Sequence, residues 1–287
     1  MNGKSINTTA EAPIHSGFIE AGQIPTHYLA GGEGDCVVLL HGSGPGVSAE
    51  ANWRLILPAL ARKQRVVAPD LLGFGQTRVS DDTCFNLDVW VRHLEAFLDA
   101  MQIDQATLVG NSFGGALALA LATRSSARVS RVVLMGAVGV HFSITDALEQ
   151  VWGYTPSLDN MRRLLKLFAY DTGRITDDLV RLRHEASLVP GIQETYARMF
   201  PIPRQQCLDA LVTDEDEIAK IEQPVLIVHG RDDKVIPVSV ANKLFEIIPD
   251  ARLHVFARCG HWTQIERADE FAALVQGFLD CTDNTRS

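Results

Sequence analysis

The sequence predicts an α/β fold with a mostly parallel central sheet and helices on both faces, and three observations lead to this prediction. Short apolar segments without strict alternation recur along the chain, as expected for strands buried on both faces of a parallel sheet. Stretches with apolar residues at helical spacing separate them. The chain has 287 residues, 46% of them hydrophobic and 21% charged, which is typical of a soluble globular protein and excludes a disordered one.

The expected strands and helices alternate along most of the chain. Residues 17–30 indicate one or two antiparallel strands at an edge of the sheet. Buried strands are expected at Val37–Leu40, Arg65–Pro69, Ala106–Gly110, Arg131–Met135, Pro224–His229 and Arg252–Phe256. Apolar residues at helical spacing predict helices over residues 87–101 and 271–279. Because crossovers between parallel strands are right-handed, such helices cover the faces of the sheet.

The alternation of strands and helices stops after residue 140. From there to residue 215, helical patterns occur at Met161–Tyr170, Asp177–Ala186 and Ile192–Met199, with no convincing buried strand. We therefore expect an α/β core formed by residues 1–140 and 216–287, and an all-helical cap formed by residues 141–215. Ligands of open α/β sheets bind at the carboxyl ends of the strands, so the cap is expected to cover that edge.

Charge and cysteine content exclude several classes of protein. The formal net charge of −9 argues against partners rich in phosphate, so we expect neither nucleic-acid nor membrane binding. No apolar run approaches the roughly 18 residues of a membrane span, and residues 1–18 lack the apolar region of a signal peptide. The five cysteines are scattered without CxxC spacing, so we expect no metal site and a reduced, cytoplasmic protein.

The segment Gly110–Gly115 carries the sharpest chemical signal in the chain. Its sequence, GNSFGG, matches G-x-S-x-G and lies between a strand pattern and an apolar helical pattern, the context of a nucleophile elbow. The glycines are needed because a Cβ atom there would collide with the neighbouring chain in so sharp a turn. We expect Ser112 to be the nucleophile and the N–H of Phe113 to stabilise an oxyanion. A chance match in a glycine-rich turn is the alternative.

A serine nucleophile needs a base and a carboxylate that orients the base. Of the nine histidines, His261 is the best candidate, since it follows the last strand pattern and precedes the last helix. GRDD follows the strand before it, and the order Ser, Asp, His is the one expected of such a fold. We favour Asp233 as the acid, with Asp232 as the alternative. Structural or unrelated positions are expected for His15 in the tail, His93 on a helix, His229 beside a turn and His254 in a strand.

The segment His41–Gly46 is the candidate for the second half of an oxyanion hole. Its glycines allow the backbone to approach a substrate closely, and the N–H of Ser43 would pair with that of Phe113. A glycine-rich turn without a catalytic role is the alternative. Phosphate binding is not indicated, because the lysine motif of a P-loop does not occur.

With these residues assigned, the sequence resembles the meta-cleavage product hydrolases of bacterial aromatic degradation, which are members of the α/β-hydrolase superfamily. The resemblance runs from about residue 19 to residue 279 and rests on HGSGPGVSAEANWR, VGNSFGG, LMGAVG, GRDDKVIP and CGHWTQIE. The cap segments VWGYTPS, FAYD, LRHEAS and RMFPIPRQ are most similar to the subgroup that acts on ring-fission products of phenol, toluene and small alkylbenzenes. Its archetype is 2-hydroxymuconate-semialdehyde hydrolase.

The resemblance implies hydrolysis of the C5–C6 bond of 2-hydroxy-6-oxohexa-2,4-dienoates, which yields 2-hydroxypenta-2,4-dienoate and a small carboxylic acid. It implies that the dienol first isomerises to its keto form. Ser112 would then attack the C6 carbonyl, with His261 as the base and Asp233 orienting it. A homo-oligomer, such as a dimer, would fit the family, and no metal or organic cofactor is implied.

Polar residues that hold the dienoate in this family fall on Asn52, Asn111, Arg183 and Trp262. A guanidinium binds a carboxylate through two hydrogen bonds, which gives Arg183 a physical role. Three of these positions also have a structural alternative. Asn52 could be a helix N-cap, Arg183 could lie on a solvated helix face where Glu185 pairs with it or with Arg181, and Trp262 could be plain packing.

Several positions differ from the pattern of the family. Glu50 stands where relatives usually carry an aromatic residue, His184 where they often carry Tyr or Trp, and Cys207 where they often carry Trp. The segment GFGQ is followed by an unusual Thr77-Arg78. We expect Cys207 and the apolar cap residues to face the C6 substituent, so the size of that substituent stays open.

Two other functions remain possible on the sequence alone. A carboxylesterase or lactonase would use the same three residues but would have no need for Arg183 in the site. A small-molecule receptor on this scaffold would bind without turnover, although nothing in the sequence disables the three residues. A haloalkane dehalogenase is disfavoured, because its chemistry places a carboxylate where Ser112 stands.

Overall fold

A computed structural model describes residues 12–281 of the chain. The expectation about a signal peptide falls mostly on residues 1–11, which lie outside the described residues. Within residues 12–281, eight strands form one sheet in the order β1-β2-β4-β3-β5-β6-β7-β8. Their bounds are β1 Ile14–Ala21, β2 Ile24–Gly31, β3 Cys36–Leu40, β4 Arg65–Pro69, β5 Ala106–Asn111, β6 Val129–Met135, β7 Val225–Gly230 and β8 Ala251–Phe256. The strands from β3 to β8 pair in parallel, so the predicted α/β fold is confirmed.

The two ends of the sheet differ from the expectation. The N-terminal hairpin of β1 and β2 is antiparallel and begins earlier than predicted, so His15 lies in β1 and not in a tail. At the other end, β8 is an edge strand in which Arg252 and Val255 are exposed, so the prediction of burial on both faces is wrong there. An edge strand has only one neighbour and a less covered face, which explains the exposure.

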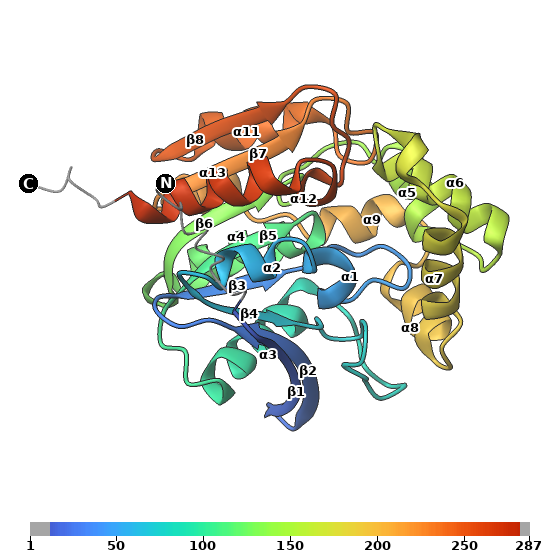
Figure 1. Ribbon diagram of the computed structural model, residues 1–287, viewed down its shortest axis with the longest axis horizontal. Coiled ribbons are helices and arrows are strands. Elements are labelled where there is room, and N and C mark those ends of the chain that lie inside the picture. The colour runs from blue at the N-terminus through green and yellow to red at the C-terminus, as the bar shows by residue number, and fades with distance from the viewer. Residues whose placement is uncertain (1–11, 282–287) are drawn as a thin grey trace, which may run out of the picture.

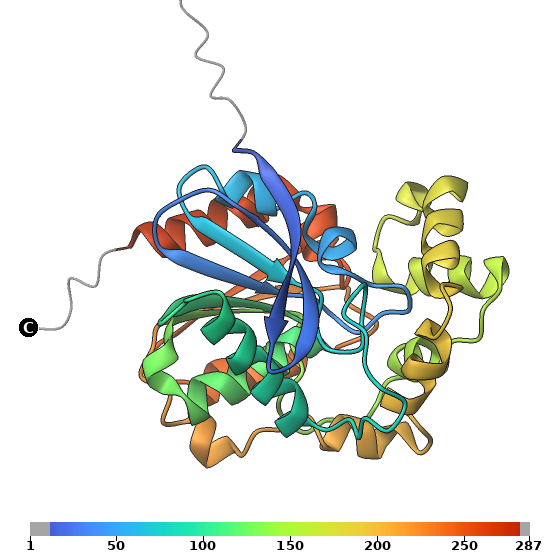
Figure 2. The same ribbon diagram turned by 90° about the horizontal axis from the view of Figure 1, so that it is seen from below.

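Helices cover both faces of the sheet (Figures 1 and 2). One face carries α1 Ala49–Trp53, α2 Leu57–Leu60 and α13 Ala268–Asp280, and the other carries α3 Leu87–Ala100, α4 Phe113–Arg124 and α11 Val238–Ile247. The helix α4 is buried along nearly its whole length, because it packs between the sheet and α3. Its uniformly apolar sequence fits a helix that has no solvent-facing side.

Only helices lie between β6 and β7 within the described residues. They are α5 Asp146–Trp152, α6 Leu158–Phe168, α7 Asp177–Ser187, α8 Ile192–Met199, α9 Arg204–Asp209 and α10 Glu215–Ile218, with a short 3₁₀ turn at Thr172–Arg174. Figure 1 shows α5 to α8 stacked at one end of the sheet, beyond the strands. The sequence patterns marked α6, α7 and α8 but missed α5, α9 and α10.

Within residues 12–281, no helix combines the length and the apolar character that crossing a membrane requires.

Candidate active site

Ser112 lies at the junction of β5 and α4 in a backbone conformation that L-residues rarely adopt. Its φ is 52° and its ψ is −114°. A Cβ atom on Gly110 would come within 2.4 Å of the carbonyl oxygen of Gly114, and one on Gly114 within 2.3 Å of that of Leu40. The turn therefore has the tight, strained geometry that the GNSFGG segment predicts, and such strain recurs at functional sites.

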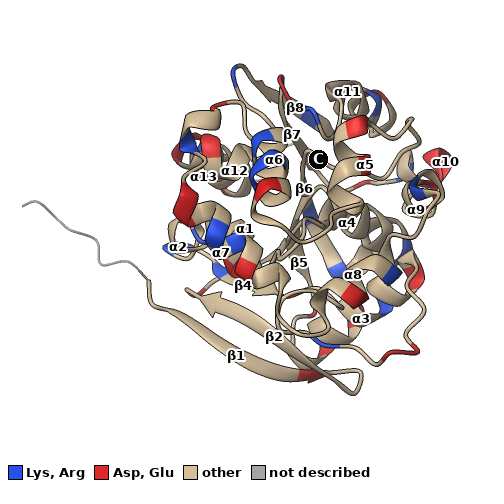
Figure 3. Cartoon of the chain, turned by 90° about the vertical axis from the view of Figure 1, so that its right-hand side faces the viewer, with Lys and Arg blue, Asp and Glu red and all other residues tan. Residues whose placement is uncertain are grey.

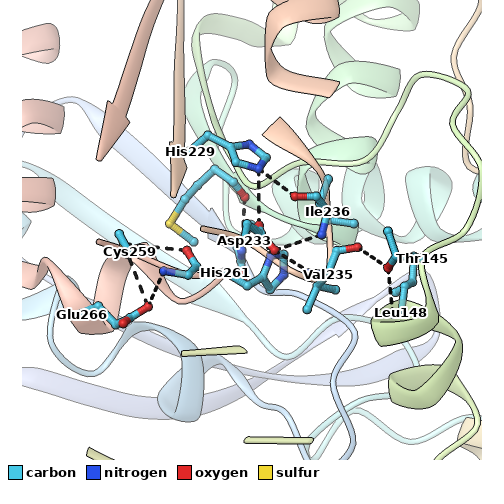
Figure 4. A network of polar contacts seen from close by, with 12 residues as sticks. Thr145, Leu148, His229, Asp233, Val235, Ile236, Cys259, His261 and Glu266 are labelled. Atoms are coloured by element: carbon cyan, nitrogen blue, oxygen red, sulfur yellow. Dashed lines mark hydrogen bonds and ion pairs between the residues drawn. The ribbon is translucent and has the colours of Figure 1, made fainter. Parts of the chain in front are cut away.

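His261 and Asp233 form a buried pair. His261 follows β8 and precedes the short helix α12, Thr263–Glu266, and its Nδ1 lies 2.7 Å from Oδ2 of Asp233, which follows β7. The Nδ1–H donates to this carboxylate, which leaves Nε2 free to accept a proton. Figure 4 shows the two side chains at the centre of a polar network. Asp232 does not contact His261; its backbone N–H donates to the carbonyl oxygen of Cys259.

The carboxylate of Asp233 is held from several sides. Its Oδ1 accepts from the backbone N–H groups of Val235 and Ile236 at 2.8 and 3.0 Å. The Nε2 of His229 donates to the carbonyl oxygen of Ile236 and lies 3.4 Å from Oδ2 of Asp233. Burial alone would raise the pKa of Asp233, but the charge and hydrogen bonding of His261 and His229 hold it well below its usual range. Asp233 is therefore ionised at neutral pH.

Gly136 lies directly behind this pair. Its φ is +51°, and a Cβ atom there would come within 3.1 Å of Nδ1 of His261 and 3.4 Å of Oδ2 of Asp233. Only glycine fits this position without strain. The segment LMGAVG at the end of β6 therefore leaves room for His261 and Asp233, through Gly136, and supplies no functional side chain of its own.

One cavity joins most of the candidate residues. It lies between the carboxyl ends of the strands and the cap helices, and Ser43, Asn52, Asn111, Ser112, Arg183, His261 and Trp262 all line it. Asp233 lies behind His261, and the Phe113 ring packs in the core against Trp90, with ring centroids 4.8 Å apart. The ring of Phe113 is thus packed away from the cavity, and its backbone N–H is the group that is a candidate for contact with an oxyanion.

Arg183, on α7, is the unusual charge in this cavity. Its side chain is buried, its Nη2 donates to the carbonyl oxygen of Pro45 at 3.1 Å, and its Nε has no hydrogen-bond partner. Within residues 12–281 no carboxylate pairs with it; Arg181 pairs with Asp178, and Glu185 reaches neither arginine. Burial and then the charge of Arg54 lower the pKa of Arg183 to about 10, so it remains charged at neutral pH. A buried, unpaired cation is costly unless a ligand anion neutralises it.

The other predicted contacts have distinct surroundings. Asn52 is not the N-cap of α1, because Ser48 caps this helix by accepting from the N–H of Ala51; the Nδ2 of Asn52 is buried without a partner. Asn111 donates through Nδ2 to the carbonyl oxygen of Met135 at 3.2 Å. The ring of Trp262 stacks on Phe168 at 4.9 Å, so it packs and lines the cavity at once.

The loop that carries Ser43 is tied to the cap. The indole Nε1 of Trp152, at the end of α5, donates to Oγ of Ser43 at 2.9 Å. The hydroxyl of Tyr196, on α8, lies 2.8 Å from the carbonyl oxygen of Ser43 and 3.0 Å from that of Val151. Sequence reasoning missed both residues. The composition of α5 and α8 gave no signal for them, because a contact over more than 100 residues depends on the tertiary fold.

The apolar part of the cavity comes from residues that the sequence did not single out. Leu148 and Val151 of α5, Phe168 of α6 and Val235 of the loop after β7 line it. The expectation that Cys207 faces this space is wrong, because its thiol donates to the carbonyl oxygen of Pro201 at 3.2 Å and it lines a different hollow beside α3. Cys207 lies on the short helix α9 and lines the hollow beside α3 instead of the cavity around Ser112.

Comparison with known proteins decides the family. Residues 35–268 match the family described as the alpha/beta hydrolase fold. The chain belongs to the α/β-hydrolase family. Within it, this hydrolase is 51% identical over 266 residues to 2-hydroxy-6-oxo-2,4-heptadienoate hydrolase of Pseudomonas putida F1, covering 93% of this chain and 96% of that protein. It is 50% identical over 274 residues to 2-hydroxymuconate semialdehyde hydrolase of Pseudomonas sp. CF600, covering 96% and 97%.

Solved structures agree with this assignment. A meta-cleavage product hydrolase from Pseudomonas fluorescens IP01, complexed with acetates, is 52% identical and superposes with a TM-score of 0.91 over 92% of this chain and 97% of that one. The 2-hydroxy-6-oxo-6-phenylhexa-2,4-dienoate hydrolase of Rhodococcus sp. RHA1 is 30% identical, with a TM-score of 0.87 over 94% and 100%. The α/β-hydrolase described here thus belongs to the meta-cleavage product hydrolases, and the resemblance seen in its motifs is confirmed.

Proposed function

We propose that this α/β-hydrolase cleaves the C5–C6 bond of 2-hydroxy-6-oxohexa-2,4-dienoates that carry a small C6 substituent. The observation that carries the proposal is the buried guanidinium of Arg183, which has no carboxylate partner within residues 12–281 and lines the same cavity as Ser112. A dienoate supplies the missing anion at one end and a reactive carbonyl at the other. A simple ester carries no negative charge, so in an esterase no part of the substrate would neutralise the buried guanidinium.

The proposed reaction divides the work among the residues of the cavity. Arg183 and Asn52, each with an unpaired buried N–H donor, hold the carboxylate end of the substrate, with Asn111 and Trp262 beside them. The dienol isomerises to its keto form, so that the C5 carbon becomes a tolerable leaving group. Ser112 then attacks the C6 carbonyl and gives its proton to Nε2 of His261, which Asp233 keeps in the correct orientation.

Two further steps complete the proposed cycle. The N–H groups of Ser43 and Phe113 stabilise the oxyanion that forms on the C6 oxygen. When the C5–C6 bond breaks, its electron pair is delocalised from C5 onto the C2 carbonyl oxygen. This oxygen takes up the proton that His261 accepted from Ser112, and the fragment leaves as 2-hydroxypenta-2,4-dienoate. His261 then deprotonates a water molecule, which hydrolyses the acyl ester of Ser112 and releases the carboxylic acid.

The preference for a small substituent has separate support. Two relatives at about half identity are named for substrates with a methyl group or a hydrogen at C6, whereas relatives named for a phenyl substrate are 30 to 35% identical. Leu148, Val151 and Val235 close the apolar side of the cavity. An all-helical cap at residues 141–215, which we propose as the lid of the site, supplies the first two of these; α10, at Glu215–Ile218, crosses the proposed boundary.

We further propose that the enzyme acts in the cytoplasm. All five cysteines lie within the described residues and are free thiols, which fits a reducing compartment. A homo-oligomer stays a prediction.

The test compares three dienolates with simple esters. The yellow ring-fission products of catechol, 3-methylcatechol and 3-phenylcatechol carry hydrogen, methyl and phenyl at C6, and loss of visible absorbance is followed together with the acid released. We expect efficient cleavage of the first two and much slower cleavage of the third. Rapid hydrolysis of p-nitrophenyl esters without consumption of any dienolate would instead favour a carboxylesterase.

A further inference from the structure

A second cavity lies beside the first, between the cap and the core. Its volume is about 360 Å³, against about 20 Å³ around Ser112. Two core loops, at residues 46–50 and 73–78, form one side, and residues from the end of α7 to α8 form the other. Phe74, Val189 and Ile192 give it apolar walls, whereas Glu50, Gln76 and Arg78 give it a polar rim.

A single turn of backbone separates the two cavities. Val47 lines both of them. The carbonyl oxygen of Pro45 accepts the hydrogen bond from Arg183, and Gly46 packs so closely on α7 that a Cβ atom there would lie 2.9 Å from the carbonyl oxygen of Arg183. A ligand in the second cavity is therefore one loop away from the guanidinium that we propose as the carboxylate site.

The space around Ser112 is too small for a substrate to enter without a movement of its walls. A volume of about 20 Å³ holds about one water molecule, whereas a dienoate is several times larger. Entry of a dienoate therefore requires a shift of a wall, such as the turn at residues 45–47 or the helix α7. The second cavity adjoins that turn and is large enough to hold the substrate before this shift.

Few charged side chains line the second cavity, namely Asp70, Arg78 and Glu50. Asp70 is buried there but is already satisfied, because its carboxylate accepts from His27 at 2.8 Å and from the backbone N–H groups of Ala49 and Gln76. Arg78 is exposed and makes no ion pair within residues 12–281, and Glu50 is exposed on the opposite loop. Elsewhere on the cap, basic and acidic side chains are interspersed (Figure 3), so no field of one sign covers this face.

We propose that this second cavity is an entry vestibule that receives the anionic, conjugated carboxylate substrate before it reaches Arg183. Arg78 attracts the carboxylate, Glu50 opposes it, and the apolar walls take the carbon chain. The inference rests on the proposed function, because it assumes an anionic substrate.

The test measures the rate constant for association of the methyl-substituted dienolate. Stopped-flow absorbance follows binding to protein that carries Ser112→Ala, which binds without turnover. At low ionic strength, we expect added Arg78→Gln to lower the association rate constant about two- to three-fold and added Glu50→Gln to raise it by a similar factor. Both effects fade in about 0.5 M salt, because salt at that concentration shortens the screening length to about 4 Å and weakens the attraction or repulsion of the approaching anion.

The control removes the same charge elsewhere. Arg92, on α3, is exposed and does not line the vestibule, so Arg92→Gln should leave the association rate constant within about 20% of its reference value. Equal, small effects of all three variants would overturn the vestibule, and so would effects of Arg78→Gln and Glu50→Gln in the same direction. Failure of the unmodified enzyme to consume any dienolate would overturn the proposed function itself and the vestibule with it, so the two failures are distinguishable.

Discussion

At the residue scale, Arg183 is the group that we propose to select the ligand of the cavity. Its guanidinium is buried and charged, and only the carbonyl oxygen of Pro45 accepts a hydrogen bond from it within the described residues. An isolated cation in such surroundings costs free energy, which a carboxylate in the cavity offsets. The planar fork of donors is as important as the charge, because it fixes the direction from which the carboxylate binds.

The exchange Arg183→Lys tests this role. Lysine keeps the charge but presents a point charge in place of two parallel N–H donors, so we expect kcat/KM for the dienolate to fall by roughly 10- to 100-fold. Steady-state kinetics with the methyl-substituted dienolate measure the change, and thermal unfolding serves as the folding control. Near wild-type kinetics would remove Arg183 from the carboxylate site.

Asp233 gives a second prediction at the same scale. In Asp233→Asn the amide cannot stabilise a protonated His261 or hold it in the same tautomer, so we expect kcat to fall by about 10⁴-fold. The variant should also change the pH dependence of stability. Because the folded-state pKa of Asp233 is depressed, its contribution is complete above its unfolded pKa of about 3.9 and is lost as the pH falls towards the folded value.

The measurement is the difference in Tm between the wild type and Asp233→Asn from pH 6 to pH 3. We expect the wild type to be the more stable at pH 6 and its advantage to shrink below about pH 4. A difference that stays constant over this range would show that the Asp233 carboxylate is not held in its charged form by the fold.

At the scale of elements, α5 connects two loops of the site. The hydroxyl of Thr145, at its N-cap, donates to the carbonyl oxygen of Val235 at 2.8 Å, in the loop that presents Asp233 (Figure 4). At its other end, Trp152 donates to Ser43. One cap helix thus spans the distance between the acid loop and the proposed oxyanion loop, and fixes both against the core.

Removal of one of these bonds should affect catalysis more than binding. Trp152→Phe keeps the stacking on Phe200, whose ring centroid lies 4.5 Å away, but loses the donor to Ser43. A neutral hydrogen bond is worth about 1 kcal/mol, so we expect kcat to fall about five-fold with little change in KM. Thermal unfolding of Trp152→Phe serves as the folding control. An unchanged kcat, or an equal loss in KM and kcat, would contradict a positioning role for Trp152.

The elements also show what the sequence could predict. The strands from β3 to β7 and the helices α3, α6, α7, α8 and α13 carry enough periodic residues to be recognised. The helices α5, α9 and α10 have 7, 6 and 4 residues, so they hold too few turns for a period to emerge. The exposure of β8 depends on its place at the edge of the sheet, which its own composition does not reveal.

Some residues of the site could be predicted from the sequence, and others could not. Ser112, Asp233 and His261 lie in motifs whose order and flanking strands identify them without tertiary information. Trp152 and Tyr196 contact Ser43 across sequence separations of 109 and 153 residues, and no local sequence pattern predicts such contacts. The wrong expectation for Cys207 had the same origin, since it depends on which way the short helix α9 faces.

At the scale of the whole molecule, the helices between β6 and β7 lie over the cavity, and the anionic substrate that we propose must reach it against a net charge of −9. Attraction therefore comes from individual cations near the route and in the site, not from the overall field. The helices between β6 and β7 contribute the buried cation, part of the apolar wall and the hydrogen bonds to the loop of Ser43, whereas the core carries the residues that we propose as nucleophile, base and acid. Catalysis on this account requires both parts at once.

The most direct test of the central claim uses Ser112→Ala and the methyl-substituted dienolate, 2-hydroxy-6-oxohepta-2,4-dienoate. The wild type should convert it to 2-hydroxypenta-2,4-dienoate and one equivalent of acetate. In the variant, the rate of acetate release should fall by several orders of magnitude, because the members of such a triad act as a unit, while binding of the dienolate still perturbs its absorbance. Acetate release by Ser112→Ala at a rate near that of the wild type would contradict the assignment of Ser112 as the nucleophile.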